Sequence, residues 1–200
     1  MKTIWSILLI VVMFFTLAAC GSLGRNDSAP IEKGSTKAIG KTIVVFYSGS
    51  GNTQRVAEII ADELKADSFE IVPKEIYSAT DLNWRNRESR VNREHDNASL
   101  QNVELVSTKV PNWEEYNVVL FGYPLWWRDA AWVVRGFIKD NDFTGKTVIP
   151  FCTSTSNGIG DSGRNLEKMA GTGIWLEGIR FSEKPSEDSV REWAQSLDLE

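Results

Sequence analysis

Short apolar runs alternate with amphipathic stretches along most of the chain. Residues 42–47 form an apolar run rich in β-branched and aromatic side chains, which suits a parallel strand buried on both faces. Apolar residues from Val56 to Leu64 then recur at helical spacing, so a helix is expected to begin close to Thr53. The first ordered unit is therefore a strand, a turn and a helix in direct succession.

The same alternation continues toward the C-terminus. It predicts strands over 68–73, 118–123, 147–152 and 174–179, and helices over 130–139, 162–170 and 187–197. Pro73 and Pro124 are expected to end two of these strands, because proline has no N–H to donate to a sheet. Since strands and helices alternate, the pattern predicts an α/β domain with a doubly wound parallel sheet covered on both faces.

Residues 74–112 lack this clear pattern. Between residues 81 and 95, arginines stand among acidic side chains and apolar residues are few. This composition predicts a poorly buried helix, and the simplest account of the whole segment is a solvated cover. His95 lies in it without a serine or cysteine partner, which favours a solvated rather than a catalytic histidine.

Residues 1–19 have the layout of a bacterial secretory signal, with a basic start, an apolar run and small residues before Cys20. The stretch Leu-Ala-Ala-Cys at 17–20 resembles the lipobox of bacterial lipoproteins, which implies that Cys20 becomes the lipid-modified first residue of the mature chain. An uncleaved membrane anchor is the alternative, but the run is shorter than the roughly 20 residues of a spanning helix. Either way, the following domain is expected outside the cytoplasm, anchored to a bacterial membrane.

Residues 20–40 are poor in large apolar side chains and are typical of a flexible tether, which leaves 41–200 as one domain. A hydrophobic content of 42% is sufficient for its core. Apart from Cys20, the only cysteine is Cys152, so no internal disulfide is expected. The net charge of −5 argues against nucleic acid or anionic lipid as the main partner.

The turn between the first strand and the first helix has the composition of a phosphate-binding loop. It consists of Ser48, Gly49, Ser50, Gly51, Asn52 and Thr53. Its hydroxyl, amide and backbone N–H groups could surround an anion at the positive end of the helix. The loop lacks the lysine of a Walker A motif and the third glycine of a dinucleotide fingerprint. An ordinary glycine- and serine-rich connection that binds nothing is the alternative.

Aromatic residues follow the predicted strand at 118–123. The stretch contains Tyr123, Pro124, Leu125, Trp126 and Trp127. In a doubly wound sheet of order 2-1-3-4-5, the carboxyl ends of strands one and three open into one crevice, so these aromatics would face the phosphate loop. Indole rings are suited to stacking on a planar heteroaromatic ring. Packing of the tryptophans beneath the following helix is the alternative.

A third loop, rich in small and hydroxyl residues, follows the predicted strand at 147–152. It contains Thr153, Ser154, Thr155, Ser156, Asn157 and Gly158. Its backbone amides and small polar side chains could approach the hydrogen-bonding edge of a flavin. A flexible polar loop without a ligand is the alternative.

Together, the three loops resemble the phosphate loop and the two ring-binding loops of flavodoxins, over about residues 41–197. The resemblance implies a three-layer α/β/α fold with a five-stranded parallel sheet of order 2-1-3-4-5. It also implies non-covalently bound FMN, with its phosphate on Ser48, Ser50, Asn52 and Thr53. Residues 123–127 would border one side of the isoalloxazine and residues 153–158 the other. Many flavodoxins have a ring-stacking tyrosine in the second ring loop, whereas residues 153–163 contain no aromatic residue.

The leading hypothesis is a lipid-anchored, FMN-binding protein that transfers electrons between redox partners, either proteins or small quinone-like acceptors. This role requires no catalytic side chain, and the sequence shows no cluster of metal ligands. A flavin-dependent quinone or nitro-compound reductase is one alternative, and a non-redox lipoprotein of the same fold is another. The extra length at 74–112, which includes Trp84 and His95, is a candidate for covering the flavin or meeting a partner.

Overall fold

The computed structural model describes residues 40–197 and residue 199. The predicted signal at 1–19, the lipid site at Cys20 and the tether up to residue 39 therefore lie outside the described residues. Within the part that is described, no helix is both long enough and apolar enough to cross a membrane.

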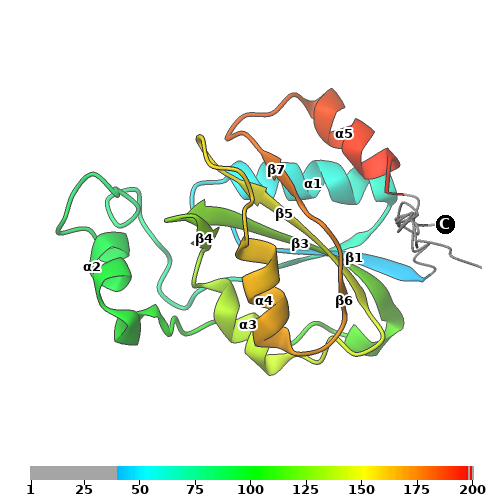
Figure 1. Ribbon diagram of the computed structural model, residues 1–200, viewed down its shortest axis with the longest axis horizontal. Coiled ribbons are helices and arrows are strands. Elements are labelled where there is room, and N and C mark those ends of the chain that lie inside the picture. Colours follow the sequence, from blue (N-terminus) through cyan, green and yellow to red (C-terminus); the bar gives the residue numbers. More distant parts are fainter. Residues whose placement is uncertain (1–39, 198, 200) are drawn as a thin grey trace, which may run out of the picture. The chain divides into compact units, whose positions relative to one another are not determined.

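A parallel sheet forms the centre of the described domain (Figure 1). Its strands are β1 (Lys41–Phe46), β2 (Asp67–Glu70), β3 (Tyr116–Trp126), β5 (Thr147–Thr153), β6 (Ile174–Trp175) and β7 (Ile179–Phe181). They lie in the order β2-β1-β3-β5, and both β6 and β7 then pair with β5. When β6 and β7 are taken as one interrupted edge strand, this is the predicted order 2-1-3-4-5.

Helices cover both faces of the sheet and give the three predicted layers. α1 (Asn52–Leu64) and α5 (Glu187–Gln195) lie on one face, with α3 (Val134–Asp140) and α4 (Ser162–Ala170) on the other (Figure 1). Successive residues of a strand point to opposite faces. Accordingly, Val44 packs with Val56 and Val190 in one core cluster, whereas Val45 packs with Phe137 in the second.

Pro124 does not end its strand, contrary to the sequence prediction. β3 continues to Trp126, and Pro124 still lies opposite Thr153 of β5. Beyond it, Leu125 and Trp126 pair instead with a short antiparallel strand, β4 (Asp129–Ala130). The carbonyl of Pro124 accepts a hydrogen bond from the N–H of Ala131, so the residue is used as an acceptor alone. The strand thus changes partner at the proline, and this hairpin delays α3 to Val134, four residues after its predicted start.

The predicted edge strand at 174–179 is also interrupted. Trp175 pairs with Val148 and Ile179 with Phe151, so three residues of the edge chain stand opposite two residues of β5. One of those two is Pro150, which cannot donate to the ladder. The extra residue forms a bulge that divides the strand into β6 and β7.

Only the end of the predicted helix at 81–95 is helical. α2 (Arg90–Asp96) is preceded by turns and followed by two short 3-10 helices, Ala98–Gln101 and Trp113–Glu115. In the turns, the side chains of Asn83 and Asn86 accept hydrogen bonds from backbone N–H groups two residues later. Such local bonds compete with the helix. α2 is also better buried than predicted, because Val91 and Glu94 are both buried.

Candidate flavin-binding groove

The carboxyl ends of β1, β3 and β5 bring the three predicted loops to one edge of the sheet. Phe46 lies opposite Gly122, and Tyr123 lies opposite Cys152, so the strands end almost level. A ring of Phe151 covers Gly122, where a Cβ atom would come within 2.2 Å of the Phe151 ring. Only glycine therefore fits between these strands at the base of the site.

The phosphate loop leads directly into α1. Gly51 occupies the N-cap position with a φ of 84°, a left-handed conformation that favours glycine. No side chain caps this end of the helix, and its first turn contains no acidic residue. The first backbone N–H groups of α1 are thus available to an anion, in the positive field of the helix N-terminus. The side-chain amide of Asn52 donates to Ser50 Oγ (3.3 Å) and orders the loop.

Thr53 joins the phosphate loop to the loop after β5. Its side chain is 1% exposed, and its Oγ1 lies 2.8 Å from Oγ1 of Thr153 in a buried hydrogen bond. Two of the predicted site residues are thereby fixed to each other across the sheet.

Two hydroxyl groups beside this loop are buried without a hydrogen-bond partner among the described residues. They are the phenol of Tyr47 and Oγ of Ser48. Burial raises the pKa of Tyr47, so its phenol remains a donor at neutral pH. An unpaired buried hydroxyl typically costs about 1–3 kcal/mol, which makes these groups suitable ligands for a bound polar molecule.

A groove of about 260 Å³ separates the three loops. It is lined by Gly49, Ser50, Asn52, Pro124, Leu125, Trp126, Thr153, Ser154 and Thr155 from the predicted set, and by Leu82, Trp84 and Glu183. The sequence did not single out Leu82 or Glu183, because neither belongs to a motif or follows one of the three strands directly. Three loops with complementary chemistry therefore share one cavity.

Trp126 stands among aromatic side chains that hold it edge-on. Its ring centroid lies 5.8 Å from that of Tyr47, 5.4 Å from Tyr77 and 4.7 Å from Trp132. Edge-to-face contacts of this kind are favourable. The indole is therefore fixed from behind while its residue still lines the groove.

Two predicted ring contacts lie elsewhere. The side chain of Tyr123 is fully buried in the core, and its hydroxyl lies 3.0 Å from Ser162 Oγ. Trp127 does not line the groove but stacks on His95, with ring centroids 4.2 Å apart, and on Trp132 at 5.8 Å. His95 is thus one partner of an aromatic stack and is not solvated on both faces.

The turn that carries Trp127 is strained. Trp127 and Arg128 both have positive φ angles, 49° and 68°, although neither is glycine. Residues in this region cost free energy and persist where surrounding contacts hold them. The stacking of Trp127 on His95 and Trp132 supplies such contacts.

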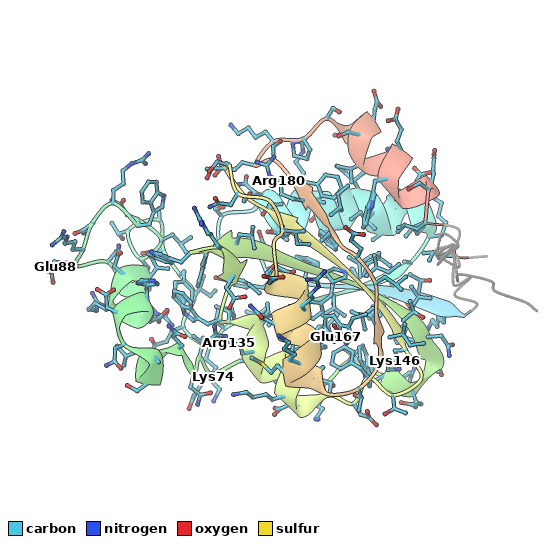
Figure 2. The ribbon with its side chains drawn as sticks, in the orientation of Figure 1. Lys74, Glu88, Arg135, Lys146, Glu167 and Arg180 are labelled. Carbon is cyan, nitrogen blue, oxygen red and sulfur yellow. The ribbon has the colours of Figure 1, made fainter. Side chains whose placement is uncertain are left out.

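Arg180 of β7 orders the third loop. Its guanidinium donates to the carbonyls of Ser154 (2.6 Å) and Thr155 (2.9 Å), and Figure 2 labels this side chain. Ser154 Oγ also donates to the carbonyl of Asn157. The predicted contacts Ser156, Asn157 and Gly158 are exposed and do not line the groove. Sequence reasoning missed Arg180, which lies 26 residues after Ser154.

Segment 74–112 is anchored to the site by Glu94. The carboxylate of Glu94 accepts hydrogen bonds from the hydroxyl of Tyr77 (2.5 Å), the indole N–H of Trp132 (2.7 Å) and Nε of Arg90 (2.6 Å). Burial and the bond to Glu94 raise the pKa of Tyr77, which therefore stays protonated. Since Tyr77 and Trp132 both contact Trp126, the segment supports the groove from outside.

Neither a metal centre nor a reactive thiol is found in the described part of the chain. No group of three or more histidine, cysteine or acidic side chains within it could hold a metal ion. Cys152 is completely buried at the end of β5, and burial raises the pKa of its thiol to about 12. It is a small core residue, as its place in the sequence predicts.

Comparisons with known proteins agree with this arrangement. A sequence model of the family described as Flavodoxin matches residues 41–197. A protein from Bacteroides eggerthii assigned as a flavoprotein is 32% identical, with a TM-score of 0.70 over 80% of this chain and 99% of its own. A similarly assigned protein from Bacteroides uniformis is 33% identical, with a TM-score of 0.70 over 78% of this chain and 98% of its own.

A flavoprotein from Lactobacillus acidophilus, solved in complex with FMN, shares the fold. It is 19% identical, with a TM-score of 0.55 over 78% of this chain and 99% of its own. No curated protein matches the sequence.

Proposed function

This chain belongs to the flavodoxin family, and we propose that it binds FMN in the groove and transfers electrons between redox partners. The observation that carries the proposal is the meeting of a phosphate loop, a fixed tryptophan and a loop of small polar residues around one cavity. FMN is the cofactor supported by the family match, and it is also the ligand named for the related Lactobacillus acidophilus flavoprotein.

The residues at the groove fit the chemistry of FMN. The open N-terminus of α1 and the unpartnered hydroxyl of Ser48 suit the doubly charged phosphate. Leu125 and Trp126 offer apolar surface to the ring, whereas Thr153 to Thr155 offer small side chains and backbone polar groups near its hydrogen-bonding edge. When bound, FMN supplies one-electron and two-electron redox chemistry that protein side chains lack.

A carrier fits the groove better than an acid–base enzyme. Among the described residues that line it, Glu183 is the only one with an ionisable side chain. Proton transfer to a substrate usually needs a positioned acid or base, most often histidine. The one histidine, His95, is stacked on Trp127 outside the groove. The protein's part is therefore to bind the cofactor, exclude water and tune its electrostatics.

Ser48→Ala provides a specific test of cofactor binding. The hydroxyl of Ser48 is buried without a partner in the described structure, so its removal should not lower the melting temperature of the cofactor-free protein and should raise it if the hydroxyl is unpaired there. Affinity for FMN should fall about five- to tenfold if the hydroxyl binds the phosphate. Ser107→Ala, at an exposed position far along the chain, is the matched control.

The purified full chain should be yellow or become so on addition of FMN, with quenched flavin fluorescence. A chain that takes up no FMN would overturn the proposal. Electron exchange between the photoreduced protein and a one-electron redox protein would support the proposed role as an electron carrier. Steady oxidation of NAD(P)H by a quinone would instead establish a reductase, the enzyme alternative predicted from the sequence.

We further propose that the protein works outside the cytoplasm on a lipid anchor at Cys20. The support is the secretory layout of residues 1–19 and the small residues before Cys20. Labelling of cells with a radioactive fatty acid should mark the wild-type chain but not Cys20→Ser. Labelling of both proteins, or of neither, would contradict the anchor.

A further inference from the structure

Trp84 is a large aromatic side chain that remains exposed at the edge of the groove. It is 59% exposed, and it lines the same cavity as Trp126 and Thr153 to Thr155. Aromatic side chains normally gain free energy by burial, and exposed ones near a cavity often mark a binding surface. Trp84 comes from segment 74–112 and from none of the three loops that follow β1, β3 and β5.

The backbone at Trp84 is held in place. The side-chain amide of Asn92, on α2, donates to the carbonyls of Trp84 (2.9 Å) and Asn86 (2.8 Å). Leu82, two residues before Trp84, packs against the core, and one of its methyl carbons would lie 3.2 Å from a Cβ atom at Gly49. Segment 74–112 is therefore fixed both to α2 and against the phosphate loop.

The indole of Trp84 has one face covered by protein. The guanidinium of Arg85 lies 4.3 Å from the ring centroid, a cation–π contact that orients the indole. The rest of the ring is free to contact a ligand, in keeping with its exposure. In Figure 1, α2 lies beyond the carboxyl ends of the strands, and Figure 2 labels Glu88 in the turns that connect Trp84 to α2.

The loop after β5 leaves one side of the groove without an aromatic wall. It contributes Thr153, Ser154 and Thr155, all of which have small side chains. A planar ring bound beside Trp126 would thus lack a stacking partner from this loop. Trp84 is the other aromatic residue that lines the groove among the described residues.

We propose that Trp84 is the second aromatic wall of the groove and stacks on the flavin ring. This inference rests on the proposed binding of FMN. It makes segment 74–112 part of the cofactor site, with Asn92 and Arg85 as positioning residues for the indole. The wall is supplied from the connection between β2 and β3, which explains how the loop after β5 can consist of small polar residues.

The test compares FMN affinity and bound-flavin fluorescence for the full chain and its variants. Trp84→Ala should weaken FMN binding about tenfold, equivalent to about 1.4 kcal/mol, because a stacking partner is lost. Trp84→Phe should stay within about threefold of wild type, since it keeps an aromatic face. Leu100→Ala is the matched control, because Leu100 is 49% exposed on the same segment and does not line the groove.

Melting temperatures of the cofactor-free variants show whether each variant folds. If Trp84→Ala does not fold, Trp84→Gln replaces it as the variant that lacks the indole. Wild-type affinity in a folded Trp84→Ala or Trp84→Gln would overturn the stacking role and leave the FMN proposal intact. An equal loss in Leu100→Ala would also overturn it, since the effect would then belong to the segment and not to the indole. A wild-type chain that binds no FMN would overturn the proposed function itself.

Discussion

Replacement of Glu94 by glutamine is expected to loosen segment 74–112 from the domain. The residue is 5% exposed. Its Oε2 accepts hydrogen bonds from Tyr77 and Trp132, and its Oε1 accepts one from Arg90, so both oxygens are used. The side chain of Arg90 is itself only 17% exposed, which makes the pair largely buried. Glutamine has nearly the same size but a single acceptor oxygen.

The cost follows from the donors that glutamine cannot satisfy. If the amide oxygen of glutamine faces Tyr77 and Trp132, its NH₂ group points at the guanidinium of Arg90 and the ion pair is lost. If the amide is reversed, the NH₂ group meets the indole N–H of Trp132, which cannot become an acceptor. Either orientation removes at least one charge-assisted hydrogen bond and leaves a donor unpaired. We expect a loss of about 3 kcal/mol.

Urea denaturation at pH 7 and 25 °C, followed by tryptophan fluorescence and by far-ultraviolet circular dichroism, measures this loss. Four of the eight tryptophans, Trp84, Trp126, Trp127 and Trp132, lie in the segment or against it, so the fluorescence is weighted toward this region, whereas the dichroism reports the whole domain. An earlier transition in fluorescence would mean that the segment opens before the sheet. Glu104→Gln is the control, because Glu104 pairs with Lys74 at the surface and its loss should not be measurable. A Glu94→Gln protein within about 0.5 kcal/mol of wild type would refute the anchoring role.

Three further predictions concern the sheet. Gly122→Ala should lose about 2–3 kcal/mol in urea denaturation, because its Cβ would lie 2.2 Å from the ring of Phe151. Cys152 should react with a thiol reagent at pH 8 only as fast as the chain unfolds, since burial raises its pKa to about 12. The hydrogen bond from the Tyr116 hydroxyl lowers the pKa of Asp67, so the ionised carboxylate stabilises the folded state. The difference in unfolding free energy between wild type and Asp67→Asn should therefore be constant above about pH 5 and shrink as the pH falls below about 4.

Each of these predictions has a contrary outcome. Gly158→Ala adds a Cβ to open space and should not change the free energy of unfolding. If Gly158→Ala and Gly122→Ala lose the same stability, the clash with Phe151 is not the cause. The labelling experiment uses the native protein with Cys20 replaced by serine. If its thiol reacts at the rate of a free thiol, Cys152 is accessible. A stability difference for Asp67→Asn that is the same at pH 2 and pH 7 would disprove the role of the carboxylate.

The parallel sheet could be predicted because its strands are continuous apolar runs. β1 is buried from Ile43 to Phe46 and β5 along its whole length, so most positions of both runs are apolar and the signal was strong. The helix predicted at 162–170 is α4 with the same bounds. Family resemblance then placed the three loops at one edge, and the structure brings nine of the predicted residues to one groove.

Predictions failed where a turn or a distant contact overrides the local pattern. β3 changes its partner after Pro124 because a short hairpin with β4 follows directly, whereas the proline alone predicted the end of the strand. Glu94 looks in the sequence like any acid in a charged stretch, but it is buried against Tyr77, Arg90 and Trp132, the last of which lies 38 positions away. Trp127 follows Trp126 directly, but the left-handed turn directs it to His95 and away from the groove.

The hydrogen bond between Thr53 and Thr153 joins residues that are 100 positions apart, which imposes an order on folding. The phosphate loop can form with β1 and α1, but the groove does not exist until β5 has docked on β3. Because the closure of so long a loop costs entropy before any contact compensates for it, this step is expected late in folding. A partly folded chain would therefore carry a phosphate loop without a ring site, and tight uptake of cofactor would report that the whole sheet has been completed.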